Sequence, residues 1–593
     1  MTGIKKINLI SAVLVSLSLC GGCTLEKAGN SSQDQTVQED NEPEQVKAEK
    51  AEKEEINEIH LRDKDSLYEN DDDTSVVTMY LTVSKGNSSE NTYHTWKEIN
   101  SYSVYDYEDM GVERYQVAGL LQVGDENGPT QGEVGYGERV PNATVQIRGQ
   151  TSSQNAQKNY KIELKKNKGT WRGQRTINLN KHMTEGMRFR NKLAYDLIRG
   201  IPQMVGLRTQ FVKDNTEESG GKFEDYGIYT QVEQLNKTAL KSHGLDSNGQ
   251  LYKINSFEFY RYEDIIKKED DAGYDKTAFE KMLEIKGDSD HTKLIDMLTD
   301  LNDYSIGIED VLKEHFDEEN IVYWMAFQIL MGNVDTQNRN VYLYSPLNSD
   351  IWYFIAWDND GCLMRPEYEL RNFSDQNSWE KGISNYWGNI LFQRCLKSRS
   401  FREKLNDAIL DLREYLNKDM LTSKIESYKN VLKPYLYLMP DAEYEPLTSE
   451  QYDQIAASLP DEIEKNYQLY LESLETPMPF YIGVPSIDGD KLKFNWDVSY
   501  DLDAEDITYS VEVARDYLFQ DVIYQNTTLT VPESEMELPN AGQYFVRVRA
   551  TNTSGKTQDA FDYYVTDEGK HYGMKCFYIT EDSTVEEDNY EEG

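Results

Sequence analysis

One central segment places the tightest constraint on how this chain can fold. Residues 320–331 are apolar on most sides of a predicted helix, and a helix of that kind belongs inside a core. A polar loop, residues 333–340, follows directly, and residues 341–344 and 352–356 then have the pattern of two strands. The sequence therefore predicts a buried helix, a polar loop and a hairpin, in that order.

Two acidic stretches in this segment carry the residue types that phosphoryl transfer requires. The loop contains Asp335 and Asn340, and Asp358 and Asp360 follow the hairpin. A phosphotransferase uses one Asp to orient the attacking hydroxyl, and an Asn and a second Asp to hold the magnesium that bridges the phosphates. Protein kinases place a catalytic Asp and a metal-binding Asn at the same spacing. Because Asp, Asn and Gly are also the commonest turn residues, two acidic loops that cap a hairpin are the alternative.

An earlier polar turn is a candidate for phosphate binding. A predicted strand ends at Arg148, a turn with Gly149 and Ser152 follows, and a second strand begins just after Lys158. Backbone N–H groups and hydroxyls in such a turn can hold phosphate oxygens, and a nearby Lys can neutralise them. An ordinary hairpin is the alternative, because Gly and Ser are common in turns between strands.

Alternating polar and apolar residues beyond Pro477 and Pro479 predict a separate all-β module. Three such runs, spaced by turn residues, favour a β-sandwich of about 100 residues. The stretch Gly542–Asn552 resembles the late strands of a fibronectin type III domain. We therefore expect a fibronectin-III-like sandwich over residues 476–580, followed by an acidic tail over residues 581–593.

The N-terminus has the pattern of a secretory signal, with basic residues before a short apolar run and two glycines before Cys23. The apolar run, Ile7–Leu19, is shorter than the roughly 20 residues that span a bilayer. The pattern resembles a bacterial lipoprotein signal over residues 1–23, in which Cys23 becomes the lipid-modified first residue; an ordinary cleaved signal peptide is the alternative. We expect a protein on the extracellular face of a bacterial membrane, held by its lipid anchor only, with residues 24–75 as an acidic disordered tether.

The net charge of the chain disfavours two kinds of binding partner, nucleic acids and anionic membranes. There are 62 Lys and Arg residues against 105 Asp and Glu residues, which gives a net charge of −43. A nucleic-acid binder needs a basic face to neutralise phosphates, so we expect no nucleic-acid partner. The same charge disfavours docking of the protein surface on an anionic membrane. The three cysteines beyond Cys23 are widely spaced, which favours buried free thiols.

Four motifs occur along the chain in this order: Arg148-Gly149-x-x-Ser152 with Lys158-x-Tyr160, then Arg190-Asn191-Lys192-Leu193-Ala194, then Gly227-Ile228-Tyr229-x-x-Val232-Glu233, and last Asp335-x-x-x-x-Asn340 followed by Trp357-Asp358-x-Asp360. In this order they resemble the motifs of the spore-coat protein H (CotH) kinase-like family, and the resemblance spans roughly residues 76–474. Two positions depart from the family pattern: Gln157 stands where a Pro is usual, and Asn359 where an apolar residue is usual.

The resemblance implies an α+β fold in which an atypical two-lobed protein-kinase-like domain, residues 76–475, binds ATP between its lobes and precedes the all-β sandwich. It implies that Asp335 is the catalytic base. It also implies that Asn340 and Asp358 ligate Mg²⁺ or Mn²⁺.

The same resemblance implies the residues that would bind the nucleotide. Lys158 would contact the phosphates, with Glu233 as its orienting partner. Arg148 and Ser152 would help to form the phosphate loop.

These features favour a cell-surface lipoprotein that transfers the γ-phosphate of ATP to Ser, Thr or Tyr residues of secreted or surface proteins. A non-catalytic surface binding or adhesion protein with the same fold is the alternative, and its sandwich is a candidate for cell-wall or carbohydrate contact. A carbohydrate-processing enzyme could use Asp358 and Asp360 as paired carboxylates, but positions i and i+2 at a strand end rarely straddle a glycosidic bond. Transfer of labelled phosphate distinguishes these functions.

Overall fold

The computed structural model describes residues 60–69, 71–371, 379–566 and 569–588. Cys23 with the predicted signal, and residues 24–59 of the predicted tether, lie outside the described residues. In the part that is described, no helix combines the length and apolar character needed to span a bilayer. Cys362, Cys395 and Cys576 are buried free thiols, as the sequence predicts.

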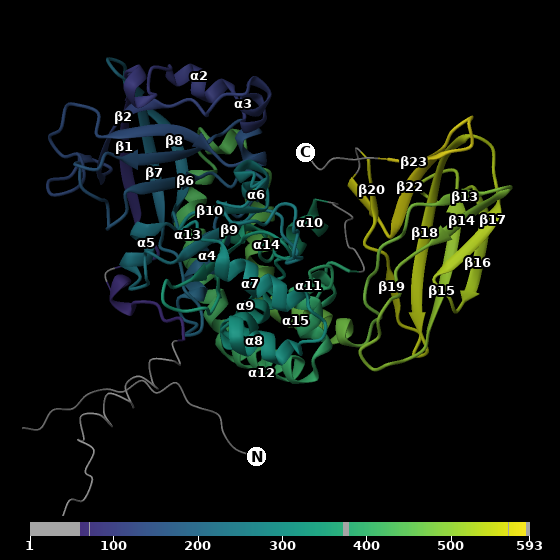
Figure 1. Cartoon of the computed structure of the whole chain (residues 1–593). Helices are drawn as coiled ribbons and strands as arrows, with labels where there is room; N and C mark the ends of the chain where they lie inside the picture. The colour runs from purple at the N-terminus through teal and green to yellow at the C-terminus, as the bar shows by residue number, and fades with distance from the viewer. Residues whose placement is uncertain (1–59, 70, 372–378, 567–568, 589–593) are drawn as a thin grey trace, which may run out of the picture. The chain divides into compact units, whose positions relative to one another are not determined.

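An eight-stranded sheet forms the first half of the domain, with the strand order β1-β7-β8-β6-β5-β4-β2-β3. Because β1 also pairs with β2, the sheet closes on itself (Figure 1). Alternate side chains fill the inside of this ring as a separate apolar core that includes Met79, Leu121 and Ile162. The strands are β1 (Val76–Ser84), β2 (Val117–Asp125), β3 (Gly128–Pro129), β4 (Ala143–Arg148), β5 (Asn159–Leu164), β6 (Thr176–Asn180), β7 (Thr209–Glu218) and β8 (Glu224–Glu233).

A smaller sheet of four antiparallel strands lies in the second half, with the order β10-β9-β11-β12. Helix α9 (Glu318–Leu330) packs beside it and is buried on nearly all sides, which confirms the predicted core helix. The Asn320 side chain of α9 accepts a hydrogen bond from the Phe354 backbone N–H at 2.7 Å and donates one to its carbonyl at 3.2 Å. The strands are β9 (Gln250–Ile254), β10 (Leu283–Ile285), β11 (Val341–Ser345) and β12 (Tyr353–Ala356).

Helix α4 (Arg190–Ile198) is buried along its whole length, although it carries three charged residues. Each charge has a partner: Arg190 bonds carboxylates of Glu185 and Glu367, both at 2.7 Å, and Lys192 bonds Asp196 at 2.8 Å. Buried charges are tolerated only when they are paired in this way. Tyr195 and Asn191 of this helix accept hydrogen bonds, both at 3.1 Å, from backbone N–H groups of the turn that follows β12, which holds the helix next to that turn.

The remaining helices cover the two sheets. The α-helices are α2 (Trp96–Ser101), α3 (Val104–Met110), α5 (Lys237–Ser242), α6 (Lys276–Met282), α7 (Thr292–Asn302), α8 (Ile308–His315), α10 (Arg365–Leu370), α11 (Ile390–Lys397), α12 (Arg399–Tyr415), α13 (Lys418–Leu436), α14 (Ser449–Ser458) and α15 (Glu462–Leu474). The 3₁₀ turns are η1 (Asp65–Leu67), η2 (Ser88–Glu90), η3 (Thr151–Gln154), η4 (Asn359–Gly361), η5 (Ser384–Tyr386), η6 (Asp441–Glu443) and η7 (Leu459–Asp461).

The C-terminal region is all-β, as expected, and has its own apolar core around Trp496, Val511 and Val548. Two sheets have the orders β13-β14-β17 and β16-β15-β18-β22-β23, and β20 pairs with β21. Strand β23 lies within the predicted acidic tail, so that part of the tail extends a sheet. The strands are β13 (Ser486–Asp488), β14 (Lys491–Asn495), β15 (Ile507–Ala514), β16 (Val522–Leu529), β17 (Glu533–Glu537), β18 (Gly542–Asn552), β19 (Thr557–Asp559), β20 (Tyr563–Thr566), β21 (Gly569–Tyr572), β22 (Met574–Ile579) and β23 (Val585–Glu587).

The described part of the predicted tether, residues 60–75 without Asn70, is packed against the domain. Leu61 is buried in the main core, and Asp63 bonds His243 at 2.6 Å. Asp73 bonds Arg199 at 2.7 Å. These acidic residues neutralise cations inside the domain, so they belong to the folded unit. The tether was expected to extend to residue 75, and this boundary is wrong because residues 60–75 without Asn70 pack against the domain.

Candidate active site

The loop between α9 and β11 holds Asp335 and Asn340 in direct contact. The Asn340 amide nitrogen donates to Asp335 Oδ2 at 2.8 Å and to the Asp335 carbonyl at 3.1 Å. Asn340 has a left-handed backbone, with φ 58°, which Asn tolerates better than most residues. The Asp335 side chain is 58% exposed and stays accessible to a substrate.

The pKa of Asp335 is raised because surrounding protein partly desolvates the carboxyl group although the side chain stays open to solvent on one side, and the negative charge of Asp360 acts in the same direction. Arg339, whose Nε lies 3.7 Å from Asp335 Oδ1, acts in the opposite direction. A raised pKa makes Asp335 a better proton acceptor.

Asp358 lies at the same end of the hairpin as Asn340. In the β11–β12 pairing Val341 faces Ala356, and the Trp357 N–H donates to the Asn340 carbonyl at 3.1 Å. Asp358 itself has φ 51° and ψ 68°, a strained backbone of the kind that clusters at functional sites. The register of the hairpin therefore brings the two predicted acidic stretches together.

The carboxylate of Asp358 makes no hydrogen bond or ion pair with any described residue. Burial raises its pKa to about 6, and the charge of Asp360 adds to this effect, while His182, Arg148 and Lys253 oppose it. A desolvated carboxylate without a partner, close to a second carboxylate, is a favourable position for a cation.

Asp360 differs from Asp358 because it has a partner. His182 Nδ1 lies 3.4 Å from Asp360 Oδ2. Although burial opposes the charge of Asp360, the interaction with His182 outweighs it and lowers the pKa of Asp360. Carboxylate and amide oxygens, which Asp358, Asp360 and Asn340 carry, are hard donors of the kind that Mg²⁺ and Mn²⁺ prefer.

Asn359, the departure from the family pattern, is fully buried, and its Nδ2 has no hydrogen-bond partner among the described residues, although its backbone N–H and its Oδ1 are bonded. Its backbone N–H donates to Asn191 Oδ1 at 3.1 Å, and its side-chain oxygen accepts from Gln328 at 3.2 Å. Gln328 in turn accepts from Asn333 at 3.0 Å. Gly361 is required beside this chain of amides, because a Cβ there would lie 2.7 Å from Asn333 Oδ1.

The predicted phosphate loop approaches Asp358 through Arg148. Arg148 ends β4 and donates to the Asn180 side chain, and its charge acts on Asp358. Gly149 has φ 90°, and a Cβ at this position would lie 2.0 Å from Ser152 Oγ. Ser152 Oγ accepts from the Asn159 side chain at 3.0 Å, which fixes the loop.

The structure does not bring Lys158 and Glu233 together. Lys158 Nζ donates to the Ser153 carbonyl at 2.6 Å, so it braces the loop from the side of α3. Glu233 binds Arg208 and lies 2.8 Å from His243 Nε2. Glu233 pairs with Ile177 of β6. Ile177 lies three residues before Asn180, the partner of Arg148, so Glu233 is about 10 Å along the strand from that contact. Neither residue contacts Asp335, Asn340 or Asp358 in the described part of the chain.

Sequence reasoning missed three residues around Asp358, namely His182, Tyr195 and Lys253. Lys253 could have been noticed, because it is a cation inside an apolar strand. Tyr195 was part of a predicted helix, and its hydroxyl accepts a hydrogen bond from the Asp358 N–H at 3.1 Å. His182 had no local pattern that pointed to a site.

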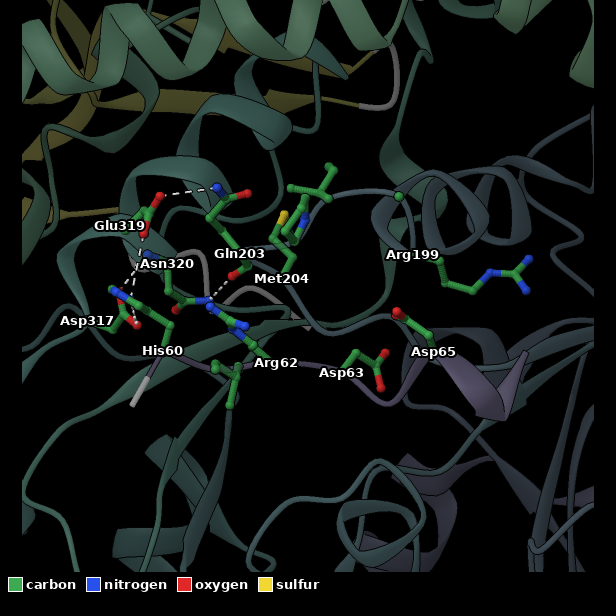
Figure 2. Close-up of a pocket in the computed structure, with 14 residues that line it drawn as sticks. His60, Arg62, Asp63, Asp65, Arg199, Gln203, Met204, Asp317, Glu319 and Asn320 are labelled. Carbon is green, nitrogen blue, oxygen red and sulfur yellow. Dashed lines mark hydrogen bonds and ion pairs between the residues drawn. The ribbon is translucent and has the colours of Figure 1, made fainter. Parts of the chain in front are cut away.

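A cavity of about 400 Å³ lies elsewhere, between residues 60–65 and the start of α9 (Figure 2). Its polar side chains bond one another: His60 lies 3.3 Å from Asp317, and Gln203 donates to Glu319 at 3.1 Å. None of the predicted site residues lines this cavity. We therefore do not assign it to the candidate active site.

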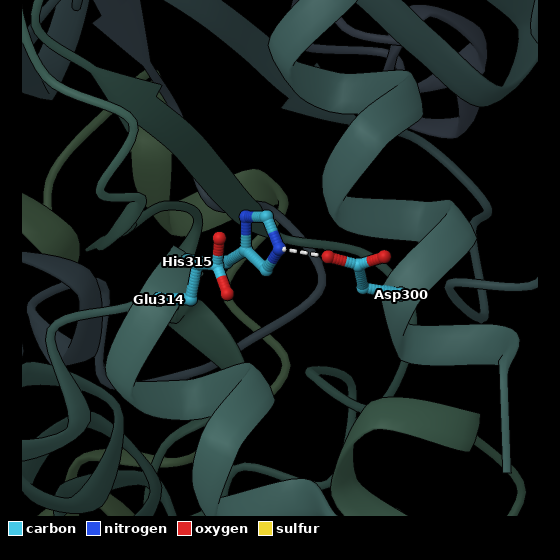
Figure 3. A group of neighbouring side chains, drawn as sticks. All are labelled: Asp300, Glu314 and His315. Atoms are coloured by element: carbon cyan, nitrogen blue, oxygen red, sulfur yellow. Dashed lines mark hydrogen bonds and ion pairs between the residues drawn. The ribbon is translucent and has the colours of Figure 1, made fainter. Parts of the chain in front are cut away.

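Asp300, Glu314 and His315 form a compact group in which the potential ligand atoms lie within 4.8 Å of one another (Figure 3). His315 Nε2 lies 2.8 Å from Asp300 Oδ2, and this contact joins α8 to α7. The three residues do not contact Asp335 or Asp358. The contact between His315 and Asp300, which joins two helices, accounts for this group of side chains without a metal ion.

The fold and the site define an α+β protein with an acidic, oxygen-rich site at the end of a hairpin. The CotH kinase protein family model matches residues 145–470, which is more than half of the chain, and the chain belongs to this family.

Two individual proteins are similar to the chain. Inner spore coat protein H of Bacillus subtilis (strain 168) is 23% identical over 302 residues, which cover 50% of this chain and 77% of that protein. The Helicobacter pylori proinflammatory kinase CtkA, known from a crystal structure, aligns with 53% of this chain over 94% of its own length. The two share 13% sequence identity, with a TM-score of 0.27.

Proposed function

We propose that this protein is an atypical kinase that transfers the γ-phosphate of ATP to hydroxyl groups of secreted or surface proteins. The observation that carries the proposal is the placement of Asp335, Asn340 and the unpartnered Asp358 at one end of a single hairpin. Membership of the CotH kinase protein family supports it.

Asp335 is the proposed base. Its exposed carboxylate accepts a hydrogen bond from the substrate hydroxyl and takes the proton as the new O–P bond forms and ADP leaves. Asn340 holds Asp335 through its amide nitrogen, and its Oδ1 has no hydrogen-bond partner among the described residues.

Asn340 Oδ1 and the Asp358 carboxylate are the proposed ligands of Mg²⁺ or Mn²⁺, with Asp360 next to them. When bound, this ion would supply positive charge that offsets the charge of the phosphates. Tyr195 and Asn191 position the turn by accepting hydrogen bonds from the Asp358 and Asn359 backbone N–H groups.

The setting of the reaction is also a proposal. The pattern before Cys23 supports a lipid anchor on the outer face of a bacterial membrane, and the C-terminal all-β region supports a fibronectin-III-like module that contacts a surface partner or cell-wall carbohydrate. A non-catalytic binding protein is the second candidate, and the position of Lys158, which braces a loop, favours it.

The direct test is incubation of the full chain, purified in detergent, with γ-labelled ATP, Mg²⁺ or Mn²⁺, and a surface-protein extract. We expect label in protein, and none with Asp335→Asn. Absence of transfer from ATP with either metal would favour the non-catalytic candidate.

A further inference from the structure

The C-terminal all-β region packs on Trp379, which belongs to the family-matched part of the chain. Phe561 and Tyr572 of the all-β region meet the Trp379 ring, with centroids 5.2 and 5.8 Å apart. Phe561 is buried in the main apolar core, although it comes from the all-β region. The Tyr572 hydroxyl also donates to Glu380 Oε1 at 3.3 Å. Because aromatic pairs stabilise an interface beyond the area they bury, we expect this contact to persist in solution.

A second aromatic contact lies at Trp387, eight residues further along the chain. The ring of Tyr500, from the all-β region, stacks on Trp387 with 5.4 Å between centroids. Lys397 adds a cation, because its Nζ lies 5.3 Å from the centroid of each ring. Trp379 and Trp387 are both 5% exposed, so the two contacts bury one short segment, residues 379–389, which we call the bridging segment.

The bridging segment also holds the loop of residues 333–340, which carries the proposed base Asp335. Three of its buried side chains bond this loop. The bonds join Asn385 to the Val334 carbonyl at 3.0 Å, Tyr386 to the Thr336 hydroxyl at 3.0 Å, and Asn389 to the Gln337 carbonyl at 2.9 Å. Since a buried polar group is costly to leave unbonded, these bonds fix the loop to the bridging segment.

Glu258 joins the same loop to the chain just beyond the bridging segment. The Asn338 amide nitrogen donates to Glu258 Oε1 at 2.6 Å, and the Phe257 backbone N–H donates to the Asn338 carbonyl at 2.9 Å. The Ile390 backbone N–H donates to the Glu258 carbonyl at 3.0 Å. The loop is therefore held at positions before and after Asp335.

The β20–β21 hairpin adds a charge from the all-β region. Lys570 of β21 lies two residues before Tyr572, which contacts Trp379. Desolvation raises the pKa of Asp335, and Lys570 is among the charges that oppose this rise. The hairpin that packs on the bridging segment thus also comes within electrostatic reach of the proposed base.

We propose that the C-terminal all-β region positions the loop of residues 333–340, because its aromatic contacts hold the bridging segment that bonds this loop. Tyr500, Trp379 and Trp387 are the positioning residues. Their effect on catalysis rests on the proposed function, whereas the bracing of the loop does not. A catalytic Asp must lie within hydrogen-bond reach of the attacking hydroxyl, so a displaced loop slows transfer.

The test uses the full chain and three variants at tyrosines of the all-β region. Tyr500→Ala removes the ring that stacks on Trp387, and Tyr500→Phe keeps it. Tyr524→Ala is the matched control, because Tyr524 packs in the core of the all-β region and its hydroxyl bonds a serine there. Hydrogen exchange of the Phe257 amide, which donates to the loop, is followed by mass spectrometry. We expect about fivefold faster exchange in Tyr500→Ala and wild-type exchange in the other two.

Phosphate transfer supplies the second readout, as the rate of label transfer from γ-labelled ATP to a surface-protein extract. The rate should fall about fivefold in Tyr500→Ala, in step with the exchange, and Tyr500→Phe should restore it. Tyr500 is 40% exposed, so its replacement leaves the fold intact.

Three results would overturn the proposal: unchanged exchange in Tyr500→Ala, faster exchange with an unchanged transfer rate, or equal losses in Tyr524→Ala. Faster exchange in Tyr500→Ala, with a wild type that transfers no phosphate, would support the bracing of the loop and refute the kinase.

Discussion

Replacement of His243 by Gln tests whether Glu233 belongs to a structural ion cluster and not to the nucleotide site. His243 is fully buried between Glu233 at 2.8 Å and Asp63 at 2.6 Å. Burial opposes its charge, but the two carboxylates outweigh burial and raise the pKa of His243 from 6.5 to about 9. The interaction with His243 also lowers the pKa of Glu233, to about 2. Both pKa shifts describe one ion pair, so its contribution to stability is counted once.

The sign of the effect follows from linkage. A histidine whose pKa is higher in the folded state stabilises the fold fully below pH 6.5, and this contribution is lost as the pH rises through 9. A shift of about 2.5 units at 1.36 kcal/mol per unit corresponds to about 3 kcal/mol. We therefore expect the unfolding free energy of the wild type to fall by about 3 kcal/mol more than that of His243→Gln between pH 6.5 and pH 9.5.

The assay is urea unfolding of the full chain, followed by tryptophan fluorescence at several pH values, with His60→Gln as a control at a half-exposed histidine. Glu233→Gln should also lower stability near neutral pH, because it leaves His243 with one carboxylate fewer. ATP affinity should be unchanged in both variants. The reasoning would be refuted if the unfolding free energy of His243→Gln depended on pH as that of the wild type does. Weaker ATP binding by a stably folded Glu233→Gln protein would also refute it.

Three further predictions concern the site and the modules. Metal–ATP at a hundredfold excess over Kd should stabilise the wild type and Asp335→Asn by about 2.7 kcal/mol and Asp358→Ala much less, and equal melting shifts in both variants would contradict the assigned roles. Cys23→Ser should release the protein from washed membranes or leave it unprocessed; unchanged fractionation would exclude the lipid anchor. A fragment of residues 476–580 should fold alone as an all-β domain with a cooperative melt, and its failure to do so would show that the boundary is misplaced.

Short-range patterns predicted the parts of the fold that depend on neighbours in sequence. The apolar run of α9, the hairpin after it and the spacing of Asp335 and Asn340 are all local, and they are found where the sequence placed them. The closure of the hairpin then brings Asp358 to Asn340 without further information.

Pairings between distant residues could not be predicted in the same way. Lys158 and Glu233 belong to separate motifs, and only the β6–β8 register shows that Glu233 lies opposite Ile177, three residues before Asn180. Asp73 belongs to an acidic run that resembles a solvated tether, yet it bonds Arg199 at the end of a buried helix.

The closed ring of β1 and β2 limits how this domain can recognise a polypeptide. An extended peptide often binds by adding a strand to a free sheet edge, through main-chain hydrogen bonds. The pairing of β1 with β2 removes that edge from the ring, and the Asn320 side chain occupies the main-chain groups of Phe354 in β12, just before the site. Main-chain pairing with a peptide is therefore obstructed at the β1–β2 closure and at Phe354 of β12, whereas β10 remains at the other edge of the second sheet.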